Sequence, residues 1–180
     1  MDYHRRSIRL DGFDYSNNRY YFVTVCCQNR EKIFGEIGVG AGLVPALMEN
    51  KMILNDVGIM VKKIILEYFN KNKLIFLDEF IIMSDHIHMI VVIKNKFINN
   101  DVNDEINTRA GTRPAPTLGM IMGEFKSIIT NEYIKNIKEN NWPRFNKRLW
   151  QRNYYERIIR NEKEYLMIKK YIKDNPINKK

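Results

Sequence analysis

The chain has 180 residues, which is enough for one domain, so we expect a single domain over residues 1–180. Hydrophobic residues make up 44% and charged residues 28% of the sequence, a balance that excludes the disordered and collagen-like classes of protein. The 30 Lys and Arg residues exceed the 21 Asp and Glu residues, and the net charge of +9 favours a partner with a phosphate backbone. Coding bias is the alternative origin of this charge, because the sequence is rich in Asn and Lys.

The sequence carries no signal for a membrane or for secretion. No apolar run approaches about 18 residues, which excludes a transmembrane helix, and no apolar segment follows the basic residues near Met1. We therefore expect a cytoplasmic protein without a membrane partner. The only cysteines, Cys26 and Cys27, are adjacent and would point to opposite faces of a strand, so they cannot form a disulfide framework.

The N-terminal half contains strand and helix patterns in succession. Residues 20–27 are β-branched and aromatic nearly throughout, which predicts a strand with both faces buried or nearly so. Residues 31–39 are predicted to be its hairpin partner or an edge strand. From Asn55 to Tyr68 apolar residues recur at helical spacing, which predicts a helix of about four turns with Asn55 or Asp56 as its N-cap.

A predicted β-hairpin lies between two irregular segments. Residues 76–83 and 86–93 are strand-like runs, and the intervening Ser84-Asp85 predicts a tight turn. Residues near 38–48 and 95–116 have compositions that favour loops, so we expect mobile insertions there. Neither segment has the glycine spacing of a phosphate-binding P-loop.

Two helices are predicted in the C-terminal half. Residues 117–139 carry an apolar stripe at helical spacing behind Thr117, a candidate cap. A last helix is predicted from Glu162 to Asp174, behind Asn161. The order of elements predicts an α+β sandwich, with helices on one face of an antiparallel sheet.

His86 and His88 are the candidate metal ligands. Two residues apart on a strand, they project from the same face of the sheet and can share one metal ion, whereas Ile87 projects into the other face. They are two of only three histidines, and they begin an otherwise apolar strand, where packing does not explain imidazoles. The alternative is a pair of exposed polar residues. Because no Cys or His cluster can complete a zinc site, the other ligands must be oxygens, which suits Mg²⁺ or Mn²⁺.

The last predicted helix carries a candidate nucleophile. Tyr171 lies among the ammonium groups of Lys169, Lys170 and Lys173, and their positive charge favours the phenolate that a tyrosine nucleophile requires. Asn175 lies one turn after Tyr171 on the same face. The alternative is that Tyr171 is a packing aromatic of an amphipathic helix, since the chain has 10 tyrosines.

These residues resemble a known family, the single-tyrosine HUH transposases, and within it the REP-associated tyrosine transposases and their insertion-sequence relatives. The HUH motif is two histidines around a bulky hydrophobic residue, and His86-Ile87-His88 is similar to it. The likeness extends from about residue 3 to residue 178, through further stretches in the family's order: Tyr21 to Thr24, Pro116 to Gly119 leading into Phe125 to Ser127, Leu149 to Glu156, and Ile159 to Glu162 followed by Tyr171-Ile172 and Asn175-Pro176.

The resemblance implies a fold and a set of catalytic roles. The family fold is a ferredoxin-like or RRM-like sandwich with a C-terminal helix that carries the tyrosine. Carried over by position, the metal ligands for Mg²⁺ or Mn²⁺ are His86, His88 and Asn175. Tyr171 is then the residue that attacks single-stranded DNA, which gives a 5′-phosphotyrosine and a free 3′-hydroxyl.

Tyr154, Tyr155 and Tyr165 are rival candidates for the nucleophile. Tyr171 is preferred because it alone is followed four residues later by the dipeptide Asn175-Pro176. The Tyr154-Tyr155 pair also precedes the last predicted helix rather than lying on it.

The aromatic and basic connector between the two C-terminal helices supplies most of the predicted DNA contacts. Aromatic rings alternate there with cations, a combination that stacks bases and follows a phosphate backbone. The alternative is that the tryptophans are core residues flanked by a solvated loop. Lys126, predicted to face out of its helix, and Lys170, beside the candidate nucleophile, extend the surface. The predicted DNA-binding residues are Lys126, Arg144, Lys147, Arg148, Trp150, Gln151, Arg152 and Lys170.

The implied function is a DNA transposase or strand transferase that cleaves and rejoins single-stranded DNA, with palindromic hairpin ends as the expected partner. Such a protein would associate with the nucleoid when bound to DNA. A non-catalytic nucleic-acid-binding domain of the same fold and a metal-dependent nuclease that uses water are the alternatives. The family includes monomers and homodimers that exchange the last helix, so both states stay open.

Overall fold

The computed structural model describes residues 19–39, 50–93 and 116–175 of the chain. The insertions predicted near 38–48 and 95–116 fall almost wholly outside these residues. The described helices and strands are β1 (Arg19–Cys26), the short 3-10 turn η1 (Gln28–Arg30), β2 (Gly35–Val39), β3 (Asn50–Leu54), α1 (Asp56–Asn70), β4 (Ile75–Ile82), β5 (His86–Ile93), α2 (Leu118–Glu139), β6 (Tyr155–Ile159) and α3 (Glu162–Asp174).

Four antiparallel strands form the central sheet in the order β4-β5-β1-β6. With the separate β2–β3 ribbon left out, the elements follow one another as β1-α1-β4-β5-α2-β6, which is the ferredoxin-like β-α-β-β-α-β succession. The helix α3 is added after β6. The predicted α+β class and ferredoxin-like sandwich are therefore confirmed.

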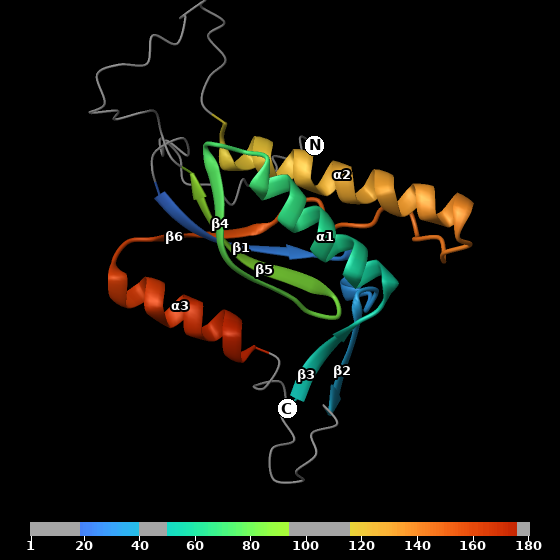
Figure 1. Cartoon of the computed structure of the whole chain (residues 1–180), viewed down its shortest axis with the longest axis horizontal. Coiled ribbons are helices and arrows are strands. Elements are labelled where there is room, and N and C mark those ends of the chain that lie inside the picture. The colour runs from blue at the N-terminus through green and yellow to red at the C-terminus, as the bar shows by residue number, and fades with distance from the viewer. Residues whose placement is uncertain (1–18, 40–49, 94–115, 176–180) are drawn as a thin grey trace, which may run out of the picture.

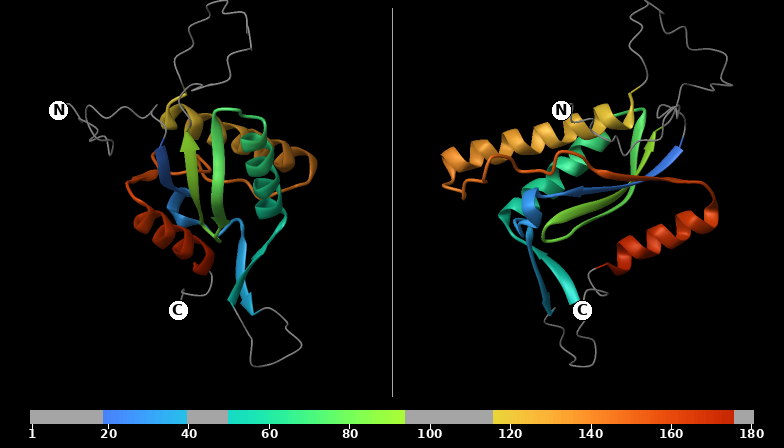
Figure 2. Two further views of the ribbon diagram at one scale, coloured as in Figure 1. Left: turned by 60° about the vertical axis from the view of Figure 1, so that its left-hand side comes forward. Right: turned by 180° about the vertical axis from the view of Figure 1, so that it is seen from behind.

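The helices cover both faces of the sheet. Figures 1 and 2 show α1 and α2 together on one face and α3 against the other face. On the first face, Tyr21, Val23 and Val25 of β1 are fully buried in the main hydrophobic core. All eight residues of β5 are buried, because α3 contacts the sheet from the second face. Its side chains therefore alternate between the core and the layer beneath α3.

The predicted helix ends are confirmed by their caps. The side chain of Asn55 accepts a hydrogen bond from the N–H of Gly58 at the start of α1, and that of Thr117 accepts one from Met120 at the start of α2. The side chain of Asn161 accepts from the N–H of Glu164 and begins α3. None of the helices described by the structure is long and apolar enough to cross a membrane.

A strand forms within residues 31–39 as predicted, but it is neither the hairpin partner of β1 nor an edge of the main sheet. β2 pairs with β3, which the sequence pattern did not reveal, and the two form a separate ribbon. The chain leaves the main sheet after β1 and enters β2 at Gly35, whose φ of 135° is favoured only for glycine. β6 was also not predicted, because this short edge strand carries charged residues within the basic connector.

Candidate active site

His86 and His88 lie at the start of β5, on the face of the sheet that α3 covers. Both side chains are buried, and their Nε2 atoms are 3.0 Å apart. Nδ1 of His86 is hydrogen-bonded to the carboxylate of Asp85, and Nδ1 of His88 is 2.7 Å from the hydroxyl of Thr24 on β1. Each ring is thus held at Nδ1 and directs Nε2 toward the same point.

The hydrogen bonds of the two rings suit a cation between them. The Asp85 carboxylate can only accept, so Nδ1 of His86 donates to it, and in the neutral ring Nε2 then keeps a lone pair. The Thr24 hydroxyl can accept or donate, so it is compatible with a lone pair on Nε2 of His88 as well. The two Nε2 atoms are 3.0 Å apart, which is also hydrogen-bonding distance, and they are close enough for both to face one small cation. Carboxylate and hydroxyl partners at Nδ1 are typical second-layer supports of metal-bound histidines.

Tyr171 meets the histidine pair from α3. Its hydroxyl oxygen is 3.4 Å from Nε2 of His88, and its ring contacts the rings of His88 and Phe22 edge to face at 5.3 and 6.1 Å between centroids. The side chain is 49% exposed, so a ligand can reach the hydroxyl from solvent. The predicted nucleophile and the two predicted ligands therefore lie together.

The rival tyrosines occupy other positions. Tyr154 is buried, with its ring 6.0 Å from the ammonium nitrogen of Lys126. The hydroxyl of Tyr165 donates a hydrogen bond of 2.9 Å to Asp78. Tyr155 is exposed on the edge strand β6, and β1 lies between it and β5. The hydroxyl of Tyr171, in contrast, lies 3.4 Å from Nε2 of His88.

Asn175 follows α3 at its C-cap and is buried, with its N–H donating to the carbonyl of Ile172.

α3 runs along β1 in the same direction, since Tyr165 contacts Tyr20 and Tyr171 contacts Phe22. The end of α3 therefore points toward the part of β1 that pairs with His88 of β5. Among the described residues no group of three or more His, Cys, Asp or Glu side chains could hold a metal ion.

A β-bulge in β4 shapes the surface on which α3 packs. The pairing of β4 with β5 shifts between Leu77 and Glu79, so one extra residue, Asp78, enters the strand there. Leu77 and Phe80 pack against the main core. Because of the extra residue, the two acidic side chains between them both face α3.

These carboxylates hold α3 through ion pairs. Asp78 accepts from the Tyr165 hydroxyl and lies 3.3 Å from the Lys169 ammonium, and Glu79 lies 3.5 Å from Lys173. Two of the three ammonium groups predicted to favour a Tyr171 phenolate are therefore neutralised by β4. The third, on Lys170, lies on an exposed residue beside Tyr171.

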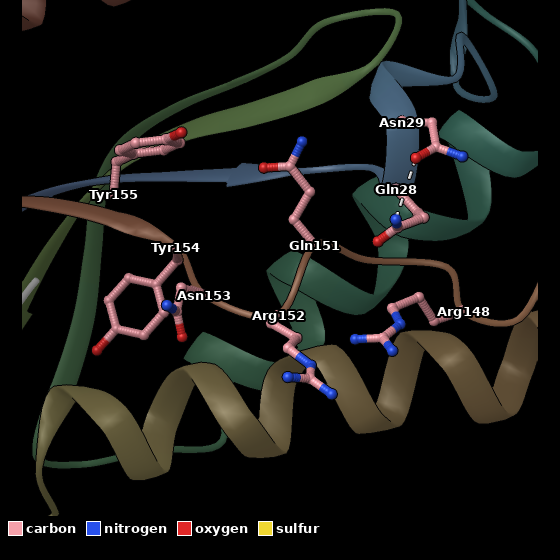
Figure 3. Close-up of a pocket in the computed structure, with 8 residues that line it drawn as sticks. All are labelled: Gln28, Asn29, Arg148, Gln151, Arg152, Asn153, Tyr154 and Tyr155. Carbon is pink, nitrogen blue, oxygen red and sulfur yellow. Dashed lines mark hydrogen bonds between the residues drawn. The ribbon is translucent and has the colours of Figure 1, made fainter. Parts of the chain in front are cut away.

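The predicted DNA-binding residues of the connector do not all lie on one surface. Arg148, Gln151 and Arg152 line a groove of about 570 Å³ beside β6 (Figure 3). Arg144 lines a different cavity of about 350 Å³. Lys147 is exposed and takes a positive φ of 62°.

Trp150 and Lys126 differ from the prediction. Trp150 is only 5% exposed, packs against Phe34 in the core, and donates its indole N–H to the carbonyl of Lys126, so it has no free face on which a base could stack. The ammonium of Lys126 does not face out but donates to the carbonyls of Gln151 and Asn153 at 2.9 and 2.8 Å. Lys126 therefore holds the connector in place, and its burial lowers its pKa to about 8.

Sequence reasoning missed several residues of the site. Asp85 was interpreted only as part of a turn, although it stands directly before His86, where a carboxylate can reach Nδ1. Thr24 could be found only from the register that pairs it with His88. Arg30 lies in a turn with positive φ, 3.6 Å from Asp85, and no pattern in the sequence indicated this contact.

Comparisons with known proteins bear on the family and the fold of the chain. No family model matches the chain. A Haemophilus influenzae protein, itself uncharacterized, is 37% identical over 185 residues, which cover 97% of this chain and 89% of that protein. Among solved structures, a REP-associated tyrosine transposase bound to a REP hairpin is similar, with a TM-score of 0.50 and 17% identity over 98% of this chain and 73% of that one. The predicted resemblance is confirmed at the level of the fold.

The variant Asp78→Asn tests whether the bulge in β4 holds α3 against the sheet. The neutral amide loses its ion pair with Lys169 and is a weaker acceptor for Tyr165, so we expect hydrogen exchange in residues 162–174 to accelerate about tenfold. Glu132→Gln, which removes a similar ion pair on α2, is the matched control and should leave exchange in α3 unchanged. Equal exchange in α3 for both variants would show that the bulge does not hold the helix.

The buried ammonium of Lys126 predicts a pH dependence of stability. Its pKa of about 8 lies below the ordinary value of 10.5, so between these values the unfolded chain binds more protons and the folded state gains stability as pH rises. We expect the free energy of unfolding of the wild type, relative to Lys126→Met, to increase by on the order of 1 kcal/mol from pH 7.5 to 9.5. Chemical denaturation at both pH values measures it. The exposed pair-forming Lys63, replaced by Met, should give no such trend.

Proposed function

We propose that this chain, which belongs to the same family as the Haemophilus influenzae protein and has the fold of a REP-associated tyrosine transposase, is a DNA transposase or strand transferase. The fold and its structural neighbour are consistent with the HUH tyrosine transposase family. The proposed substrate is single-stranded DNA, which the protein cleaves and rejoins.

The observation that carries the proposal is the contact between Tyr171 and the histidine pair. A nucleophilic hydroxyl lies 3.4 Å from His88 Nε2, which itself lies 3.0 Å from His86 Nε2. A phosphate placed at this point would meet the phenol oxygen and the metal-binding side of the histidines together, which is the arrangement that positioned phosphoryl transfer needs.

The residues present fit Mg²⁺ or Mn²⁺. His86 and His88 would hold the ion through Nε2, and the amide oxygen of Asn175 would be the third protein ligand. When bound, the ion would polarise the scissile phosphate. Asp85 and Thr24 would keep both rings oriented whether or not DNA is present.

Tyr171 would carry out the covalent step. Its phenol oxygen attacks the scissile phosphorus, a P–O bond forms, and the bond from phosphorus to the 3′ oxygen breaks. The phenol loses its proton and the leaving 3′ oxygen gains one, which leaves a 5′-phosphotyrosine and a free 3′-hydroxyl. Attack by the 3′-hydroxyl of another strand reverses the step and joins DNA without ATP, because the phosphotyrosine conserves the bond energy.

Cations around the site would bind the DNA backbone. Arg148 and Arg152 have no ion-pair partner among the described residues, and Lys170 is exposed next to the nucleophile. Arg144 and Lys147 would extend this contact along the connector.

Palindromic hairpin ends are the partner that we propose for the strand. The similar transposase is bound to a REP hairpin, and this chain shares its fold. The protein would act in the cytoplasm, at the nucleoid when it is bound to DNA, as a monomer or a homodimer.

Tyr171→Phe tests the covalent mechanism. Wild-type protein incubated with single-stranded hairpin DNA and Mg²⁺ or Mn²⁺ should give a protein–DNA adduct on a denaturing gel. The adduct should fall below detection in Tyr171→Phe, because the variant lacks the attacking oxygen. Tyr20→Phe is the control, since Tyr20 is a half-exposed tyrosine on the same face of the sheet.

Each other outcome of this experiment assigns a different chemistry. Cleavage without an adduct, retained in Tyr171→Phe, would indicate a nuclease that uses water. An adduct that persists in Tyr171→Phe and disappears in Tyr155→Phe would show that Tyr155, and not Tyr171, is the nucleophile. Binding without any cleavage would indicate a non-catalytic nucleic-acid-binding domain.

Asp85→Asn tests the histidine pair as a metal site without relying on turnover. The variant removes the anionic acceptor at Nδ1 of His86, so we expect Mn²⁺ affinity to fall about 10- to 100-fold. Electron paramagnetic resonance of free Mn²⁺ measures it, and Glu132→Gln on α2 serves as the control. His88→Ala should abolish specific binding. Unchanged affinity in His88→Ala would place the metal elsewhere.

A further inference from the structure

The groove beside β6 is formed by an irregular edge of the sheet. Cys27 forms an isolated β-bridge with Trp150, and Thr24 pairs with Tyr155. The four connector residues 151–154 therefore lie opposite only two residues of β1, 25 and 26. This mismatch moves the connector away from the sheet and opens a space of about 570 Å³, within the range of small-ligand sites. We call it the connector groove, and its lining residues are Gln28, Asn29, Arg148, Gln151, Arg152, Asn153, Tyr154 and Tyr155.

The lining of the connector groove combines amide and guanidinium groups with an aromatic ring. Four of the eight residues carry side-chain amides, which can both donate and accept hydrogen bonds. Two are arginines with no ion pair among the described residues, and none of the eight is acidic. Amides suit the edges of nucleobases and guanidinium groups suit phosphates, so the groove has the chemistry of a nucleotide site.

The groove is held open by main-chain hydrogen bonds. The N–H of Gln151 donates to the carbonyl of Cys26 at 3.0 Å, and the N–H of Gln28 donates to Leu149 at 2.9 Å. The Lys126 ammonium, on α2, donates to the carbonyls of Gln151 and Asn153 in the connector. A preformed groove loses less conformational entropy when a ligand binds.

Tyr155 connects this groove with the active-site face. It pairs with Thr24, so both side chains lie on the same face of the sheet as His88. Its side chain is 62% exposed, and two strand spacings place it roughly 10 Å from the histidines. Figure 3 shows Tyr155 and Gln151 on one side of the connector and the two arginines on the side toward α2.

We infer that the connector groove binds an unpaired nucleobase of the cleaved strand, next to the scissile phosphate, with Tyr155 as its stacking face. The amides of Gln151 and Gln28 contact the edge of the base, and the arginines contact the flanking phosphates. This inference rests on the proposed function, since it takes the strand at Tyr171 to continue across the sheet.

The exposed ring selects an unpaired base over a duplex. A base within a duplex has both faces covered by its neighbours, whereas an unpaired base can place one face on a tyrosine ring. A site for phosphate alone would need the two arginines but not an exposed ring on the catalytic face. Such a groove makes the protein read a base directly, in addition to binding the backbone.

Strand binding without turnover tests the inference. The probes are a fluorescein-labelled single-stranded dT decamer and an abasic decamer with the same number of phosphates, measured by fluorescence anisotropy in EDTA. We expect Tyr155→Ala to weaken binding of the dT decamer about tenfold and to leave the abasic decamer unchanged, because stacking needs a base. Tyr155→Phe keeps the ring and should bind dT like the wild type.

Charge variants separate stacking from backbone contact. Arg148→Ala should weaken both decamers by a similar factor, and Lys63→Ala on α1 should weaken neither. The inference is wrong if Tyr155→Ala binds the dT decamer as the wild type does, or if it loses both decamers equally.

Failure of this inference can be distinguished from failure of the proposed function. If Tyr171 forms the adduct but binding does not depend on the ring of Tyr155, the transposase proposal stands and the base site falls. If the ring dependence holds and no adduct forms, the groove is a base site in a non-catalytic protein. Circular dichroism of Tyr155→Phe and Tyr155→Ala checks that both variants are folded.

Discussion

The register of β1 against β5 is the constraint on which the rest of the site depends. Thr24 faces His88 in this register, and the same residue of β1 pairs with Tyr155 on its other side. A slip of one residue would turn both histidines into the apolar core and bring isoleucine side chains under α3. The buried Ile87 and Met89 prevent it, since they fit the core only in the observed register. The hydrophobic core on one face of the sheet thus fixes the positions of the polar groups on the other face.

Local features of the sequence predicted much of the fold and part of the site. The cap at Asn161 and the amphipathic pattern behind it identified α3, and the alternation in β5 placed His86 and His88 on one face. These predictions depend on neighbours within one turn or one strand, which a single sequence displays. β3 and β6 could not be predicted, because short edge strands with charged side chains have weak patterns and form only when a partner is present.

Long-range contacts account for the residues that were interpreted differently from what the structure shows. Trp150 and Lys126 are far apart in sequence, yet the indole of one and the carbonyl of the other meet in the folded chain. Nothing near Lys126 in the sequence supplies the carbonyls that its ammonium contacts. Carboxylates on β4 pair with Lys169 and Lys173, which were expected to favour a Tyr171 phenolate, and carbonyls of the connector bind the ammonium of Lys126, which was expected to meet DNA.

The bulge in β4 also determines which contacts attach α3 to the sheet, because it turns two carboxylates toward the lysines of that helix. α3 buries Ile172 alone among its own residues, and that side chain is not part of the main hydrophobic cluster. Ionic and polar contacts at the surface therefore carry much of the attachment, and dissolved salt screens them. Salt therefore weakens the contacts of α3 with β4 more than it weakens the apolar core between the sheet and the helices α1 and α2. Rising ionic strength would thus loosen the helix that holds the Tyr171 hydroxyl beside His88.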